Sequence, residues 1–373
     1  MTVSGDFLAH KTLIGLIGGS DKHRAVITES LMPYYRIYTF ADSEKGLDWL
    51  RTDRPVLVIL DEDTKPLGGL STLEALIRLP AARRPQILAL GAKAESPFLE
   101  MAVKRGVGAT LVKPFKHSHL LRAVSALINR VVETRWKTVS PLVAAPLLRV
   151  TEMFETLADL VGLPAALPTA EALAAGRELA EVARQGLLPE LLDALDGHDN
   201  YLLSHSIRVA GHLARFGQTV GLKDDSLVAL SVAGLLHDIG KMEIPFTILN
   251  KPGELTPDDR QVMNSHVARS LNLMARTPDL PPAILAITAT HHERLDGSGY
   301  PRGLKGEALN KLSRLVGVVD VYCALTERRP YRPPLGSEAA LDRMGAMNAA
   351  LDPGLVATFR GLVLDGLGRR VAA

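Results

Sequence analysis

The sequence is poor in cysteine and has no long apolar segment. Cys323 is its single cysteine among 373 residues, so the chain can form no internal disulfide, which fits a reducing compartment. No run of 18 apolar residues occurs, and the opening MTVSGDFLAHKTL has no apolar signal core. These absences predict a cytoplasmic protein that does not contact a membrane.

An excess of charge of either sign is also missing. The chain has 43 Lys and Arg residues against 41 Asp and Glu residues, so it has no basic surplus of the kind expected for direct DNA binding. Hydrophobic residues make up 47% of the chain and charged residues 23%, which is typical of a globular protein. A chain of this length exceeds one ordinary core, and we expect more than one domain.

Residues 1–130 alternate short apolar runs with amphipathic stretches. The runs are TLIGLIG, PVLVIL, PQILAL and ATLV, at residues 12–18, 55–60, 85–90 and 109–112. Such runs are typical of buried parallel strands, and the stretches between them have helical spacing. The alternation predicts an α/β domain in which helices cover both faces of a parallel sheet.

The remaining chain has only helical patterns. Residues 131–198 are rich in Ala and Leu and are interrupted at Gly162, Pro164 and Pro168. We interpret them as a helical linker and a possible seam of a homodimer. Residues 199–373 predict an all-α domain.

Several polar residues lie in apolar surroundings. His237 and Asp238 are adjacent in LLHDIGKMEIP, and neighbouring helical residues point about 100° apart, so both cannot lie on one solvated face. Asp320 lies in LVGVVDVYCAL, and carboxylates are rarely buried without a partner. Buried polarity requires compensation, which either a metal ion or ordinary hydrogen bonds within the core can supply.

Histidines gather in the same part of the chain. His205, His266, His291 and His292 join His237 there, and each alone is compatible with a surface residue or a hydrogen-bonded core residue. Together with the two aspartates they form a mixed imidazole and carboxylate set that suits Fe, Mn or Zn. Asp238 has two oxygens and can bridge two ions, an arrangement used for displacement at phosphorus. Lys241, about one turn further on, can neutralise phosphate oxygens.

These motifs resemble a known family. LHDIGKMEIP, ILNKPGELT, His266, HHERLDGSGYP and VDVYCALTERRPYR follow one another as in the HD-GYP domain, a subgroup of the HD phosphohydrolase superfamily. The resemblance covers roughly residues 190–345 and includes the diagnostic Gly299-Tyr300-Pro301. It implies an all-α domain that uses two or three Fe, Mn or other divalent ions to hydrolyse cyclic di-GMP to pGpG and often to GMP.

The resemblance also implies roles for individual residues. The metal ligands would be His205, His237, Asp238, His266, His291, His292 and Asp320. Asp238 would bridge, with His205, His237 and Asp320 on one ion and the other three histidines on the second. Asp238 and Lys241 would be catalytic, with Lys241 on the scissile phosphate.

Substrate contacts follow from the same resemblance. Arg329 and Arg332 would hold the phosphates of the dinucleotide, a task that suits the guanidinium fork. Gly299, Tyr300 and Pro301 would shape the pocket edge. Gly297 and Gly299 permit positive φ and close backbone approach to a ligand.

Two positions depart from the family pattern. Three-metal members have Glu one turn before the first histidine, where this chain has Tyr201, so we expect two ions, Fe or Mn first and Zn, Ni or Co as alternatives. The family usually has Asp three residues after the last ligand, where this chain has Cys323. That difference bears on the orientation of Asp320.

The N-terminal pattern resembles a response-regulator receiver, which is flavodoxin-like with five parallel strands. Asp61 occupies the position of the phosphoacceptor and Lys113 that of the receiver lysine. Gly18 and Gly19 replace the acidic pair that holds Mg²⁺, and Gly91 replaces the switch hydroxyl. We therefore expect a degenerate receiver that serves dimerisation or partner binding.

Other interpretations of this domain stay open. Asp21, Glu62 and Asp63 could form an unusual cation site, and Asp61 could be a plain carboxylate at the end of a strand. For the whole chain we expect a metal-dependent cyclic di-GMP phosphodiesterase regulated by the receiver-like domain. The alternatives are a non-catalytic cyclic di-GMP sensor or scaffold, or a hydrolase of pGpG or another cyclic dinucleotide. Protein partners would be diguanylate cyclases or a sensor kinase.

Overall fold

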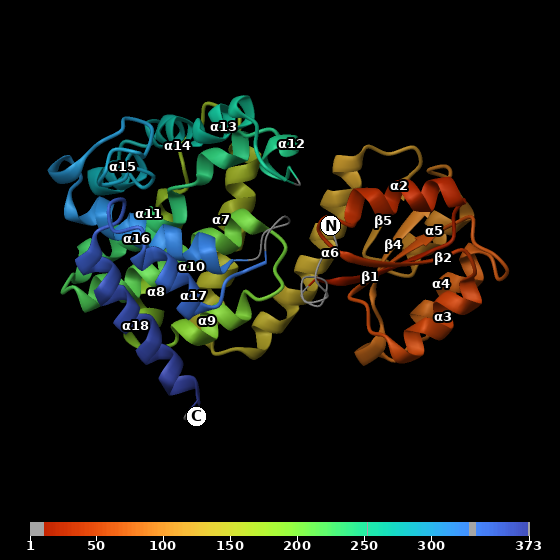
Figure 1. Cartoon of the computed structure of the whole chain (residues 1–373). Coiled ribbons are helices and arrows are strands. Elements are labelled where there is room, and N and C mark those ends of the chain that lie inside the picture. The colour runs from red at the N-terminus through yellow and green to blue at the C-terminus, as the bar shows by residue number, and fades with distance from the viewer. Residues whose placement is uncertain (1–10, 252, 328–332, 372–373) are drawn as a thin grey trace. The chain divides into compact units, whose positions relative to one another are not determined.

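The computed structural model describes residues 11–251, 253–327 and 333–371 and has two compact units (Figure 1). The first comprises Met1–Arg135 with Gly197–Asp199, and the second comprises Trp136–Asp196 with Asn200–Ala373. The first is an α/β unit and the second is helical, which confirms the predicted fold class. Among the described residues, no helix has both the length and the apolar character needed to cross a membrane.

The first unit is built on a five-stranded parallel sheet with the order β2-β1-β3-β4-β5. The strands are β1 (Leu13–Ile17), β2 (Arg36–Phe40), β3 (Leu57–Asp61), β4 (Gln86–Gly91) and β5 (Ala109–Val112). The four predicted runs correspond to β1, β3, β4 and β5. β2 lacks such a run because it lies at the sheet edge and none of its residues is buried.

Helices cover both faces of this sheet (Figure 1). They are α2 (Asp21–Leu31), α3 (Ser43–Thr52), α4 (Gly69–Ile77), α5 (Pro97–Lys104) and α6 (His117–Arg135), with the short η1 (Ala81–Arg83). One core packs α2 and α6 against the sheet through residues such as Leu31 and Leu120. The other packs α3, α4 and α5 through residues such as Leu73 and Phe98.

Helices make up most of the described part of the second unit. They are η2 (Trp136–Thr138), α7 (Pro141–Leu160), α8 (Thr169–Arg184), α9 (Leu188–Ala194), α10 (Tyr201–Thr219), α11 (Asp224–Leu236), η3 (Ile239–Glu243), α12 (Phe246–Leu249), α13 (Pro257–Asn264), α14 (His266–Met274), α15 (Pro282–Thr288), η4 (Gly306–Ala308), α16 (Lys311–Thr326), α17 (Ser337–Gly345) and α18 (Pro353–Val371). At the centre, α10 packs against α8, α11 and α16.

The stretch interpreted as a linker forms helices that pack within the second unit. The break at Gly162, Pro164 and Pro168 separates α7 from α8, as predicted. α8 packs on α11 so closely that a Cβ at Gly176 would lie 2.5 Å from a methyl group of Val232. The domain boundaries at residues 130 and 198 and the dimer seam stay predictions.

Candidate metal centre

The seven predicted ligands come together in the second unit. They come from α10 (His205), the junction of α11 and η3 (His237 and Asp238), the first residue of α14 (His266), the segment after α15 (His291 and His292) and α16 (Asp320). All are buried except His292, whose side chain is 16% exposed. Segments separated by more than 100 residues thus present imidazole and carboxylate groups to one point.

Asp238 lies between two pairs of imidazoles. Its Oδ2 lies 3.4 Å from Nε2 of His205 and 3.4 Å from Nε2 of His237. Its Oδ1 lies 3.1 Å from Nε2 of His266 and 3.7 Å from Nε2 of His291. Each oxygen therefore faces a different pair, which is the geometry that a bridging carboxylate requires.

Asp320 faces the same cluster from α16. Its Oδ1 lies 3.3 Å from Nε2 of His205 and 3.9 Å from Nε2 of His237, and its Oδ2 lies 3.5 Å from Nδ1 of His292. The presence of Cys323 one turn further on does not turn this carboxylate away. The Cys323 side chain is itself buried.

Backbone hydrogen bonds fix three of the imidazole rings. Nδ1 of His237, His266 and His291 each lies 2.7–2.8 Å from the carbonyl oxygen of the residue three positions earlier. A carbonyl can only accept, so Nδ1 carries the proton and Nε2 keeps its lone pair. The lone pairs therefore face Asp238, as metal coordination requires.

Buried charge makes the cluster attractive to cations. Burial alone would lower the pKa of His205, but the nearby carboxylates of Glu327, Asp320 and Asp238 outweigh it and raise that pKa to about 9. Burial would raise the pKa of Asp238, yet Lys241 and the histidines hold it well below its usual value. Asp238 and Asp320, whose pKa values both lie well below the usual value, are thus ionised and stabilise positive charge beside them.

Two other histidines are neutral near pH 7. Burial is the main cause that lowers the pKa of His291 to about 4. Burial, followed by the adjacent His291, lowers the pKa of His292 well below its usual value. Neutral imidazole is the state that binds a metal ion.

Unpartnered buried atoms test whether a metal ion fits. The buried side-chain atoms without a hydrogen-bond partner in the described residues include three of this cluster, Nε2 of His205, Nε2 of His237 and Oδ1 of Asp238. Such atoms are rare and costly in a folded protein. Ligand atoms within 4.8 Å of one another form two groups, His205 with His237 and Asp238, and Asp238 with His266, His291 and His292. The donor set fits two divalent ions that share Asp238.

Sequence reasoning did not identify Ser270, which joins two of the contributing segments. Its hydroxyl donates to the backbone oxygen of His237 at 3.0 Å and accepts from the backbone N–H of Gly240 at 2.8 Å. A Cβ at Gly240 would lie 2.2 Å from the backbone oxygen of His266, so only glycine permits this approach. The contact holds η3 and α14 together, and with them His237 and His266.

The Gly-Tyr-Pro segment borders the cluster. The Tyr300 ring centroid lies 4.6 Å from that of His292, and the Tyr300 N–H donates to the backbone oxygen of His292. Burial, followed by the charges of Asp238 and Asp320, raises the pKa of Tyr300, so its hydroxyl stays neutral. Pro301 is exposed.

Gly299 does not have the positive φ that the sequence analysis gave as the reason for a glycine there. Gly297 has φ of 83°, as expected. A Cβ at Gly299 would lie 2.4–2.5 Å from backbone atoms of residues 292–294, so this glycine lets the loop pack against its own backbone. Glu293, which sequence reasoning also missed, is buried and accepts hydrogen bonds from two backbone N–H groups of the same loop.

The predicted substrate cations are placed only in part. The ammonium group of Lys241 pairs with Oδ2 of Asp238, and its side chain is 12% exposed. This position puts a cation directly beside the cluster. Arg329 and Arg332 lie outside the described residues.

The receiver position in the first unit has a different character. Asp61 is buried at the end of β3, with Oδ1 2.7 Å from Nζ of Lys113 and Oδ2 2.9 Å from Nδ1 of His23. Sequence reasoning missed His23, which comes from α2. Asp21 is almost fully exposed and pairs with Arg24, so its carboxylate is not part of this cluster.

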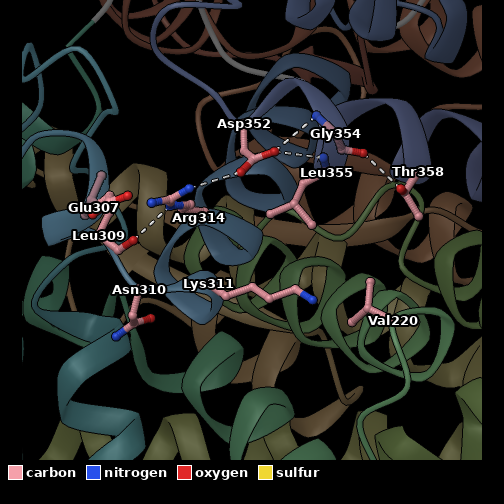
Figure 2. Close-up of a pocket in the computed structure, with 10 residues that line it drawn as sticks. All are labelled: Val220, Glu307, Leu309, Asn310, Lys311, Arg314, Asp352, Gly354, Leu355 and Thr358. Atoms are coloured by element: carbon pink, nitrogen blue, oxygen red, sulfur yellow. Dashed lines mark hydrogen bonds and ion pairs between the residues drawn. The ribbon is translucent and has the colours of Figure 1, made fainter.

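A hollow of about 780 Å³ lies elsewhere in the second unit (Figure 2). Its lining residues include Val220, Glu307, Lys311, Arg314 and Asp352. The guanidinium group of Arg314 donates a hydrogen bond to the carboxylate of Asp352 there, while the side chain of Lys311 extends across the hollow (Figure 2). None of the seven predicted ligands lines it, so it is separate from the metal centre.

Known protein families match both units. The HD domain family matches residues 190–355, and the response regulator receiver domain family matches residues 20–125. The cyclic di-GMP phosphodiesterase response regulator RpfG of Xanthomonas campestris pv. campestris is 31% identical over 88% of this chain and 80% of its own length. This chain belongs to the family of HD-domain response regulators.

Two further relatives of this HD-domain response regulator align over less than half of this chain. The cyclic di-GMP phosphodiesterase PA4108 of Pseudomonas aeruginosa is 35% identical over 43% of this chain and 39% of its own length. The 3'3'-cGAMP-specific phosphodiesterase 1 of Vibrio cholerae is 34% identical over 41% of this chain and 36% of its own length.

Proposed function

We propose that this HD-domain response regulator is a metal-dependent phosphodiesterase that hydrolyses cyclic di-GMP to pGpG, with GMP as a further product. The observation that carries the proposal is the position of Asp238, whose two oxygens face two pairs of oriented imidazoles. The relatives named as cyclic di-GMP phosphodiesterases support the choice of substrate.

The seven clustered side chains would hold two divalent ions, with Asp238 shared between them. Fe or Mn is the first expectation, and Zn, Ni or Co suit the same mixed donors. When bound, such a pair polarises a phosphoryl group and lowers the pKa of water. The fixed Nδ1 hydrogen bonds of His237, His266 and His291 keep their Nε2 atoms oriented for this task.

Residues around the cluster would bind the substrate. Lys241 holds its ammonium group against Asp238, where it can neutralise oxygens of the scissile phosphate. Tyr300 holds a neutral hydroxyl at the cluster border and can donate a hydrogen bond to the dinucleotide, with Gly299 and Pro301 shaping that edge. Arg329 and Arg332 are proposed to bind its phosphates.

A second candidate substrate is 3'3'-cGAMP. It is favoured by the similarity to the phosphodiesterase of Vibrio cholerae that is specific for this molecule. A non-catalytic cyclic di-GMP sensor or scaffold is less well supported, because all seven ligand positions carry metal-binding side chains. The substrates differ in their bases and share the phosphodiester, so the metal cluster alone does not distinguish them.

The proposal is tested on the purified full chain loaded anaerobically with Mn²⁺ or Fe²⁺. Cyclic di-GMP, 3'3'-cGAMP and pGpG are supplied separately, products are identified by mass spectrometry, and bound metal is counted by elemental analysis. We expect two ions per chain and conversion of cyclic di-GMP to pGpG. Binding of cyclic di-GMP without turnover would support the sensor, and preferred turnover of 3'3'-cGAMP would support the second substrate.

We also infer that the receiver unit regulates through binding and not through phosphorylation. Both oxygens of Asp61 already accept from cationic or polar groups, Lys113 and His23, and Gly18 and Gly19 supply no carboxylate for Mg²⁺. Its partners would be a second copy of the chain or a diguanylate cyclase. Incubation with Mg²⁺ and acetyl phosphate should leave Asp61 unmodified; a stable phosphoryl adduct there would favour a sensor kinase as the input.

A further inference from the structure

Glu327 is a buried carboxylate beside the metal centre. It immediately follows α16, and 6% of its surface is exposed. Its Oε2 lies 2.9 Å from Nδ1 of His205. Nothing in the ligand set described above requires this residue, since Glu327 faces the outer nitrogen of His205 and not the inner one.

His205 differs in this contact from three other histidines of the cluster. His237, His266 and His291 each use a backbone carbonyl of their own segment to fix Nδ1. His205 uses a charged side chain from a segment 122 residues away. A carboxylate acceptor polarises an imidazole more strongly than a neutral carbonyl does, and so makes the opposite nitrogen a stronger ligand.

We infer that Glu327 is the positioning residue of one metal site. When His205 binds an ion, Glu327 keeps the ring proton on Nδ1 and directs Nε2 toward Asp238 and Asp320. This contact strengthens the binding of the ion at that site. The inference rests on the proposed metal centre. It assigns unequal roles to the two ions, because the second group, Asp238 with His266, His291 and His292, has no contact with Glu327 in the described structure.

Cys323, four residues before Glu327, is a buried neighbour that carries no charge. Cys323 stands where the family resemblance leads us to expect Asp, and it lies one helical turn before Glu327. Burial, followed by the charges of Glu327 and Asp320, raises the pKa of the Cys323 thiol well above its usual value, so the thiol stays neutral. The charged group that meets Nδ1 of His205 is therefore Glu327 and not the side chain at position 323.

The test uses the full chain and two variants of Glu327. Glu327→Ala removes the acceptor, whereas Glu327→Gln keeps an oxygen that can accept from Nδ1 but removes the charge. Glu338→Gln, at an exposed position of α17, is the matched control. Each protein is loaded with Mn²⁺ and dialysed against graded chelator, and the ions retained per chain are counted. ¹⁵N NMR of the chain loaded with diamagnetic Zn²⁺ reports which nitrogen of His205 carries the proton, because only the neutral ring binds an ion.

We expect Glu327→Ala to release one of two ions at about 10- to 100-fold lower chelator concentration and to hold the other as the wild type does. Glu327→Gln should weaken the same ion less, and Glu338→Gln should match the wild type. In the Zn²⁺-loaded Glu327→Ala variant, the NMR spectrum should show the His205 proton distributed over both nitrogens. If Glu327→Ala does not fold, the retention of ions by Glu327→Gln tests the inference instead.

Unchanged retention of both ions in Glu327→Ala and Glu327→Gln would overturn the inference and leave the proposed metal centre intact. Equal weakening of both ions would also overturn it, since a role confined to one site excludes that result. A wild-type chain that retains no ion would overturn the inference together with the proposed function. Two retained ions without turnover of any dinucleotide would overturn only the proposed activity.

Discussion

The two units each contain a buried aspartate at a functional position, and the surroundings of the two aspartates differ. Asp61 meets an ammonium group and an imidazole of its own unit, Lys113 and His23, which satisfy both its oxygens. Asp238 meets the ammonium group of Lys241 at Oδ2, and His237, His266 and His291 around it direct their Nδ1 protons to backbone carbonyls. Its Oδ1 has no hydrogen-bond partner among the described residues. Both oxygens of the first aspartate have partners, whereas the second cluster keeps an unpartnered oxygen among donors that could hold a metal ion.

This difference shows that a carboxylate's function depends on where its neighbours direct their protons. His23 turns Nδ1 toward Asp61, while His237 turns Nδ1 toward a backbone carbonyl and Nε2 toward Asp238. The same side-chain types therefore form a closed ion pair in one unit and an open ligand set in the other. Four substitutions test this comparison.

The largest effect is expected for Asp238→Ala. Loss of the shared carboxylate removes a ligand from both proposed ions, so both should be lost and turnover should fall by about 1000-fold or more, equivalent to about 4 kcal/mol. Elemental analysis and product formation measure the two consequences. Two retained ions with undiminished turnover would refute the assigned site.

A smaller effect is expected for Gly240→Ala. The added Cβ would overlap the backbone oxygen of His266 and push α14 away from η3, which should lower the free energy of unfolding by about 2 to 3 kcal/mol and weaken metal retention. Urea denaturation measures the first change. Gly345→Ala is the control, because a Cβ there meets no atom within 4 Å and should change little. Equal stability of both variants would show that the close approach is not required.

Asp61→Asn tests the closed cluster. Removing the charge weakens the contacts to Lys113 and His23 and should lower the free energy of unfolding by about 1 kcal/mol without any change in bound metal. Denaturation and elemental analysis measure both. Asp48→Asn, at an exposed residue, should stay within about 0.5 kcal/mol of the wild type. Loss of metal in Asp61→Asn would contradict the separation of the two clusters.

The last effect appears only as the pH is lowered and concerns His212, a buried histidine outside the ligand set. Burial, aided by the charge of Arg208, lowers its pKa to about 3, so the folded protein keeps it neutral where the unfolded chain takes up a proton. Its contribution to stability therefore falls as pH falls from about 6.5 toward 3, by up to about 1.4 kcal/mol per pH unit.

His212→Gln removes this proton uptake, so the variant should lose less stability than the wild type between pH 6.5 and 5. Denaturation at a series of pH values measures the difference. The exposed His119 provides a control, and His119→Gln should keep the wild-type pH dependence. A His212→Gln variant with the wild-type slope would show that this residue does not control acid sensitivity.

Much of the fold was accessible from the sequence because buried elements are locally apolar. The runs at β1, β3, β4 and β5 were recognisable, and the prolines and glycine between α7 and α8 marked a real break. β2 was not recognised from the sequence, because a strand at the edge of a sheet need not be apolar. The packing of α8 on α10 and α11 escaped because helical spacing does not state which neighbour a helix has.

The sequence by itself named the seven side chains that gather in the second unit, because the ordered motifs around His237, His291 and Asp320 resemble those of the HD-GYP domain. Only the tertiary structure decided which nitrogen of each imidazole faces Asp238, that Ser270 and Gly240 join η3 to α14, and that Glu327 supports His205. It likewise decided that His23 closes the Asp61 cluster. The physical reason is that ligand types are local chemical properties, whereas ring orientation and charge compensation depend on contacts between segments far apart in the chain.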